Sequence, residues 1–199
     1  MKIFRLFTHN KANQTSLYDD VDIATIPDTA LLIQKRPFFV PDFTNQCMAQ
    51  LCACIRINRL GRSINERFAH RYYDANQLTL GVHFVARDLF KKLQNESRPC
   101  DLAIGFDNSV VVAEKSCVEQ ADTMSAVLCQ NEIEHVVNFS KQVLLRSVDK
   151  YLAYVSEFYT MRQGDILLLP LTKNEVQVGI DDQLKLLLNK QPLITFNVK

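Results

Sequence analysis

The sequence predicts one α+β domain that is rich in β-strands. Three observations lead to this class. Apolar and polar residues alternate with period two over residues 49–59 and 77–84, which is the spacing of strands. Helical spacing is limited to a short run at residues 66–73 and two longer runs at residues 86–96 and 147–159. The chain has 199 residues, of which 47% are hydrophobic and 23% charged, so it is long enough for a full core and is unlike a disordered or fibrous protein.

The first part of the chain is expected to hold three strands and a loop. Residues 2–7 alternate weakly and suit a first strand, whereas the polar residues 9–22 suit a loop. Residues 29–34 are expected to form a second strand, between prolines. In the third, residues 49–59, the odd-numbered positions are apolar up to Ile57. Its other face carries Gln50, Cys52, Cys54, Arg56 and Asn58.

A short helix, a strand and a longer helix are expected to follow in close succession. Residues 66–73 suit the short helix, which Asp74 and Asn76 end. The strand of residues 77–84 points Leu78, Leu80, Val82 and Phe84 to one side, and Gln77, Thr79, Gly81 and His83 to the other. Because Gly81 leaves room beside His83, the polar side suits a cavity as well as solvent. The helix of residues 86–96 stops before Arg98 and Pro99.

The second half of the chain alternates between strand signals and one helix. Residues 110–113 suit a short strand, and residues 116–138 suit edge strands and turns. Ser147 is expected to cap a helix that ends at Gln163-Gly164-Asp165 and has Val148, Leu152, Val155 and Tyr159 on one face. Three further strands are expected at residues 166–169, 183–188 and 193–198, the last two forming a hairpin around Asn189-Lys190.

Composition excludes several classes of function. The formal net charge is +1 and no basic or acidic block occurs, which argues against a nucleic-acid-binding face. No apolar run approaches the length of a membrane span, and the first residues lack the apolar core of a signal peptide. None of the six cysteines forms a Cys-x-x-Cys pair. We therefore interpret them as reduced thiols of a cytoplasmic protein that binds neither nucleic acid nor membrane.

Several sequence runs resemble the fumarylacetoacetate hydrolase family. They are RFAHRYYDA at residues 67–75, GVHFVARDL at 81–89 and GFDNS at 105–109, with KRPFFVPDF at 35–43 and RINRLGRSI at 56–64 upstream. The resemblance is strongest over residues 27–112. It implies the family's rolled mixed β-sheet with a few peripheral helices, in a single domain over residues 1–199 whose residues 1–26 form a divergent lid region.

The resemblance also implies where a metal ion would bind. Family members hold Mg²⁺ or Mn²⁺ with a Glu-x-Glu on one strand, whose side chains point to the same side, and an aspartate at the end of another. These ligand positions align with Gln50, Cys52 and His83, none of which is a carboxylate. A divalent ion loses about 8 kcal/mol of attraction per missing carboxylate at 4 Å and an effective dielectric of 20, so a family-type metal site, and any cofactor, is not expected.

Other positions of the family's chemistry have changed as well. The family lysine before Gly-Phe-Asp is Ile104, and the histidine of the family's His-x-x-Glu base aligns with His9, which is followed by Ala12 instead of a glutamate. The substrate-binding Gly-Thr-Pro loop is replaced by residues 170–174, in which Thr172 keeps one hydroxyl. Expected to remain in the pocket are Arg87, Asp88, Asp107 and Thr172, with Arg87 and Asp88 in internal ion pairs or hydrogen bonds.

Three functions follow from this reading. The first is a catalytically impaired family member, leaning away from an enzyme, that acts as a binding or partner protein, forms a homodimer and is able to pair with an active paralogue. The second is a divergent metal-dependent hydrolase, decarboxylase or isomerase of 2-oxo or β-diketo acids, in which Cys52 and His83 bind Zn²⁺ or another transition metal. The third, from composition alone, is a structural or interaction domain.

Overall fold

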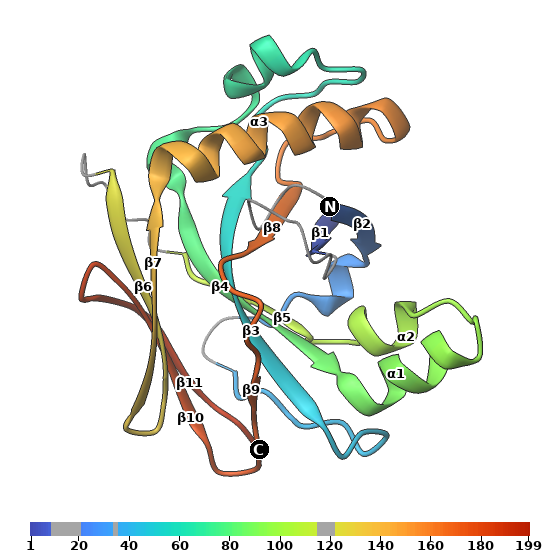
Figure 1. Ribbon diagram of the computed structural model, residues 1–199, viewed down its shortest axis with the longest axis vertical. Coiled ribbons are helices and arrows are strands. Elements are labelled where there is room, and N and C mark those ends of the chain that lie inside the picture. Colours follow the sequence, from blue (N-terminus) through green and yellow to red (C-terminus); the bar gives the residue numbers. More distant parts are fainter. Residues whose placement is uncertain (9–20, 34–35, 115–121) are drawn as a thin grey trace.

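Two β-sheets form the body of the protein, with one group of helices above them and another beside the larger sheet (Figure 1). The computed structural model describes residues 1–8, 21–33, 36–114 and 122–199. The predicted β-rich α+β class is thereby confirmed. None of the helices in these ranges is long and apolar enough to cross a membrane.

The larger sheet has seven strands and is mixed. Its order is β2-β1-β8-β3-β4-β5, with β9 paired to β3. Strands β1 and β8 pair in parallel, and the other pairs are antiparallel. The strands are β1 (Ile3–Thr8), β2 (Val21–Ile26), β3 (Cys47–Arg56), β4 (Thr79–Ala86), β5 (Val110–Val112), β8 (Ile166–Pro170) and β9 (Val176–Gln177).

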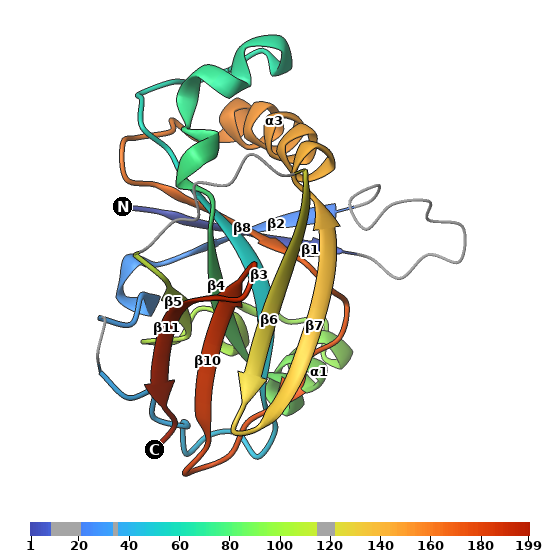
Figure 2. The ribbon, with the colours of Figure 1, turned by 90° about the vertical axis from the view of Figure 1, so that its left-hand side faces the viewer.

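The smaller sheet is antiparallel, and Figure 2 shows it face on. Its order is β11-β10-β6-β7. The strands are β6 (Thr123–Gln130), β7 (Ile133–Ser140), β10 (Gln183–Leu188) and β11 (Gln191–Asn197). The main core lies between the two sheets, because Leu51 and Phe84 of the larger sheet belong to the same buried cluster as Leu128 and Leu186 of the smaller one.

The helices form two groups, one at the top and one at the lower right of Figure 1. Helix α3 (Lys141–Phe158) packs against the 3-10 helix η2 (Glu66–Tyr72) in the first group. Helices α1 (Arg87–Asn95) and α2 (Asp101–Ile104) lie together in the second, where α1 continues directly from β4. Two short 3-10 helices, η1 (Asp28–Ala30) and η3 (Ala75–Gln77), complete the elements.

The alternation predicted for the two central strands is confirmed. Leu51 and Val82 face the main core, whereas Cys52 and Cys54 belong to a second buried cluster on the other side of the sheet. Both faces of β3 and β4 are covered. The pairing register places Gln50 opposite His83, so these two polar side chains lie side by side on one face.

One predicted strand is absent from the described residues, and one predicted helix begins and ends earlier than expected. No strand forms over the described part of residues 29–34, because the chain turns into η1 directly after Pro27 and only Leu31 makes a bridge, to Val110. Helix α3 begins six residues before the predicted cap: Ser140, not Ser147, accepts a hydrogen bond from the Val143 amide at 3.2 Å. The Ser147 hydroxyl instead donates to the Val143 carbonyl, within the helix.

Candidate functional site

A cavity of about 630 Å³ opens on the side of the larger sheet that faces away from the smaller one. It lies where β1 and β3 approach helices α1 and α2. Among the residues that line it are Arg5, Gln50, Arg87, Ile104, Lys173 and Glu175. Charged side chains of both signs therefore meet at one hollow.

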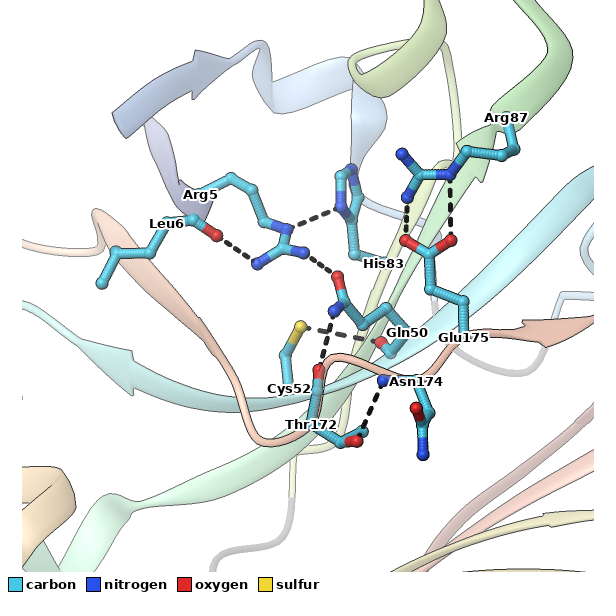
Figure 3. Close-up of polar contacts among 9 residues, drawn as sticks. All are labelled: Arg5, Leu6, Gln50, Cys52, His83, Arg87, Thr172, Asn174 and Glu175. Carbon is cyan, nitrogen blue, oxygen red and sulfur yellow. Dashed lines mark hydrogen bonds and ion pairs between the residues drawn. The ribbon is translucent and has the colours of Figure 1, made fainter. Parts of the chain in front are cut away.

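Arg5 of β1 lines this cavity and is only 2% exposed; Figure 3 shows it beside Gln50 and His83. Its neighbours Phe4 and Leu6 point into the main core, so the alternation of the strand turns Arg5 to the cavity side. The guanidinium Nε donates to His83 Nδ1 at 2.8 Å, Nη2 donates to Gln50 Oε1, and Nη1 donates to the Leu6 carbonyl. One cation thus joins strands β1, β3 and β4.

His83 is fully buried and uses both ring nitrogens. Nδ1 accepts from Arg5, which can only donate, so the proton of the ring must be on Nε2. Nε2 donates to the Ile104 carbonyl at 2.7 Å. Burial, followed by the charge of Arg5, lowers the pKa of His83 from 6.5 to about 3. The imidazole is therefore neutral near pH 7.

Gln50 suits its two partners better than a glutamate would. Its Oε1 accepts from Arg5, and its Nε2 donates to the Thr172 carbonyl at 2.8 Å. These contacts fix the orientation of the amide. An ionised carboxylate at this position could accept from Arg5 but could not donate to Thr172.

Cys52 follows Gln50 on the same side of β3 and is fully buried. Its thiol lies 3.6 Å from the Gln50 carbonyl. Burial raises the pKa of Cys52, and it also raises the pKa of Cys54, so both remain neutral thiols.

The predicted room at Gly81 is filled. A Cβ built on Gly81 would lie 2.5 Å from the Val111 carbonyl oxygen and 2.7 Å from Cys54 Sγ. The glycine therefore allows close packing of β4 against its neighbours, and it does not widen the cavity.

Arg87 and Glu175 form an ion pair on the wall of the cavity. Arg87 Nε donates to Glu175 Oε2 at 2.9 Å, and Nη2 contacts the other carboxylate oxygen. Asp88 has separate partners: it accepts from the Asn45 and Leu89 amides, at 2.8 and 2.9 Å, and from the Thr44 hydroxyl. These bonds lower the pKa of Asp88, although desolvation on its own would raise it.

The remaining predicted site residues are spread around this centre. Ile104 lines the cavity and offers its carbonyl to His83. Thr172 contributes its backbone to Gln50, whereas its hydroxyl accepts from the Asn174 amide. Asp107 is exposed and follows α2 in the chain. Neither Asp107 nor Asp88 lines the cavity. His9 lies outside the described residues.

The residues present do not fit the metal ion of the family. Gln50 and Cys52 supply a neutral amide and a neutral thiol, and both nitrogens of His83 are engaged. Arg5, which is itself a cation, occupies the space beside them (Figure 3). No group of three His, Cys, Asp or Glu side chains in the described ranges could hold a metal ion. The same engagement of His83 disfavours a Zn²⁺ site with Cys52.

Sequence reasoning missed Arg5 and Glu175. Arg5 did give a signal, because it is an arginine between Phe4 and Leu6 in a strand whose other residues are apolar up to Phe7. A buried arginine needs several acceptors, and its position pointed to a polar face. Glu175 gave none, since it lies in an irregular segment whose path depends on β8 and β9.

Comparisons of sequence and of structure point to the same group of enzymes. No family model matches the sequence. The chain is 26% identical over 166 residues to the mitochondrial oxaloacetate tautomerase FAHD1 of Bos taurus, covering 77% of this chain and 73% of that protein. In structure it is similar to fumarylpyruvate hydrolase from Pseudomonas aeruginosa in complex with Mn²⁺ and pyruvate, with a TM-score of 0.82, 14% identity and coverage of 100% and 89% of the two chains.

A second solved structure with the same fold is an isomerase. It is 5-carboxymethyl-2-hydroxymuconate delta-isomerase from Mycobacterium smegmatis, with a TM-score of 0.79 and 16% identity. The match covers 99% of this chain and 78% of that one. At such identities the structural likeness is one of fold.

Proposed function

The chain is a fumarylacetoacetate hydrolase-like protein in sequence and in fold, and we propose that it is a catalytically impaired relative that acts as a binding protein. One observation carries the proposal. The positions that align with the metal ligands of the family, Gln50 and His83, both bind the guanidinium of Arg5.

Electrostatics supports the absence of metal chemistry. A divalent ion about 4 Å from the guanidinium would be repelled by roughly 8 kcal/mol at an effective dielectric of 20. No carboxylate at position 50, 52 or 83 offsets this repulsion. The chemistry that a bound Mn²⁺ supplies, polarisation of a substrate oxygen, therefore has little support here.

A binding role uses what the cavity retains. Arg87 and Lys173 line it together with the amide of Gln50 and the ring of Phe90. Glu175 pairs with Arg87, and Asp22 and Asp101 line the same cavity. A small carboxylate would therefore bind by taking the place of Glu175 at Arg87; pyruvate is bound by the Pseudomonas relative. We propose that small 2-oxo acids bind without metal and are not turned over.

We further propose a homodimer, an active paralogue as partner and a cytoplasmic location. The smaller sheet supports the first of these: its edge strand β7 exposes Ile133 by 63% and Val136 by 54%. Exposed apolar side chains on an edge strand favour pairing with another chain.

The experiment measures turnover and binding in the same preparation. Fumarylpyruvate and oxaloacetate, the substrates named for two relatives, are followed spectroscopically with Mn²⁺, with EDTA and with neither. We expect no turnover in any condition, and binding of pyruvate that EDTA leaves unchanged. Turnover that EDTA abolishes contradicts the proposal. Copurified Zn²⁺ held by Cys52 would favour the divergent enzyme instead.

A further inference from the structure

We infer that Arg5 is a tethered cation that takes the place of the metal ion, so that the protein's own side chain organises this part of the cavity. The inference rests on the proposed function, because it explains how the fold keeps a charged centre where no metal is held. It also assigns to Arg5 a role that the family resemblance does not contain.

The topology of the sheet requires a long side chain for this role. Strand β8 lies between β1 and β3, so β1 is about 10 Å from β3. Strand β8 ends at Pro170, which pairs with Cys52, and it therefore stops short of Gln50. Arg5 extends across this end to reach Gln50 and His83, whose pairing in register brings both acceptors to the same spot.

The acceptors suit a guanidinium and not a divalent ion. Arginine donates in a fixed planar fork, and here three of its nitrogens donate to a ring nitrogen, an amide oxygen and a carbonyl. All three acceptors are neutral. Three carboxylates suit a divalent ion, whereas the neutral side chains of Gln50 and His83 offer acceptors that a guanidinium can use.

A purely structural arginine would be compatible with the same hydrogen bonds, so the test must separate the two roles. If Arg5 takes the metal's place, the ion and the guanidinium exclude each other. If Arg5 only supports the sheet, carboxylates at the three aligned positions will bind Mn²⁺ whether or not Arg5 is present.

The first experiment restores the carboxylates. One variant carries Q50E, C52E and H83D, and a second adds Arg5→Ala. Mn²⁺ affinity is measured by electron paramagnetic resonance and calorimetry, which do not depend on activity. We expect at least ~100-fold tighter binding in the variant that lacks Arg5, in line with charge repulsion at contact distance. Equal affinities would overturn the inference.

The second experiment needs no new buried carboxylate. Arg5→Ala alone removes the cation and leaves Gln50 and His83 in place, and millimolar guanidinium should raise its melting temperature. Arg59→Ala, at an exposed arginine, is the matched control and should not respond. A melting temperature of the Arg5→Ala protein that rises with Mn²⁺ as much as with guanidinium would overturn the inference.

The wild-type protein provides the test if these variants fail to fold. We expect no Mn²⁺ binding and an imidazole ¹⁵N spectrum of His83 that Mn²⁺ leaves unchanged; Mn²⁺ binding that alters this spectrum refutes the inference. The proposed function fails separately. Turnover that EDTA does not affect but Arg5→Ala abolishes would refute the proposed binding role and would support Arg5 as the cation of the site. Mn²⁺ binding without turnover would refute the role of Arg5 and would leave the proposed binding role standing.

Discussion

At Arg5, a permanently charged group is buried, and three neutral groups accept hydrogen bonds from it. The contacts to Gln50 and His83 each require a specific partner state: an amide turned towards the guanidinium, and a ring protonated on the far nitrogen. The chemistry of the site is therefore set by protonation states and amide orientation as much as by residue types.

The pKa of His83 gives a pH dependence with a defined sign. Its value in the folded protein, about 3, is below the unfolded 6.5, so the unfolded chain binds an extra proton between these values. Stability from this group is fully present above pH 6.5 and is lost as the pH falls towards 3. The cost of His83→Gln, measured by urea unfolding, should be smaller at pH 5 than at pH 8 by about 2 kcal/mol. A cost that grows on acidification would contradict this assignment.

Thiol reactivity should follow burial. Burial, followed by the charge of Asp88, raises the pKa of Cys47 to about 12, and Cys52 and Cys54 are fully enclosed. Cys100 and Cys129 are partly exposed. Brief treatment with iodoacetamide at pH 8, followed by peptide mass spectrometry, should label Cys100 and Cys129 at least ~10-fold faster than the three buried cysteines. Rapid labelling of Cys52 would indicate an activated thiol and would revive the soft-metal alternative.

At the scale of elements, the periodic strands were predictable and the irregular connections were not. The alternation of apolar and polar residues predicts strands β3 and β4. Their pairing register follows because a slip of one residue would exchange the two faces of a strand. The strand predicted at residues 29–34 was wrong because the apolar residues there do not reveal the 3-10 turn that follows Pro27. The ligand positions on β3 and β4 were therefore locatable, whereas Arg5 and Glu175 required the order of strands in space.

Gly81 tests the packing between strands. Gly81→Ala places a methyl group against backbone at Val111 and against Cys54, so we expect a loss of about 1–3 kcal/mol in the free energy of unfolding. Gly179→Ala is the matched control, because the nearest atom to its Cβ would be 4.0 Å away. Equal effects of the two substitutions in urea titrations would rule out the packing role.

The ion pair between Arg87 and Glu175 joins α1 to the segment that leads into β9. A double-mutant cycle with Arg87→Met and Glu175→Gln should give a coupling energy of about 1–2 kcal/mol, because the pair is bidentate and partly buried. The exposed pair of Arg98 and Glu96 is the control, for which about 0–0.5 kcal/mol is expected. A coupling no larger than that of the control would show that the cavity wall is held by other contacts.

At the scale of the whole molecule, the unpaired edge of the smaller sheet bears on assembly. Val136→Lys adds a charge to the exposed edge strand β7 and should increase the monomer fraction in light scattering at micromolar concentration. Ile180→Lys, at a residue exposed by 70% outside the strands, should leave the mass unchanged. A wild-type protein that is already monomeric would refute the dimer.

The parallel pairing of β1 with β8 has a consequence for the order in which the molecule assembles. Gln50 and His83 lie on neighbouring strands close in sequence, so they can meet early in folding. Arg5 joins them only through β8, and the amide of Lys2 is anchored to Asp165 at 2.8 Å across 163 residues. During synthesis β1 can pair early with β2, but this pair can join β3 in the sheet only after β8 has been made. The charged centre closes last, when both ends of the chain have met.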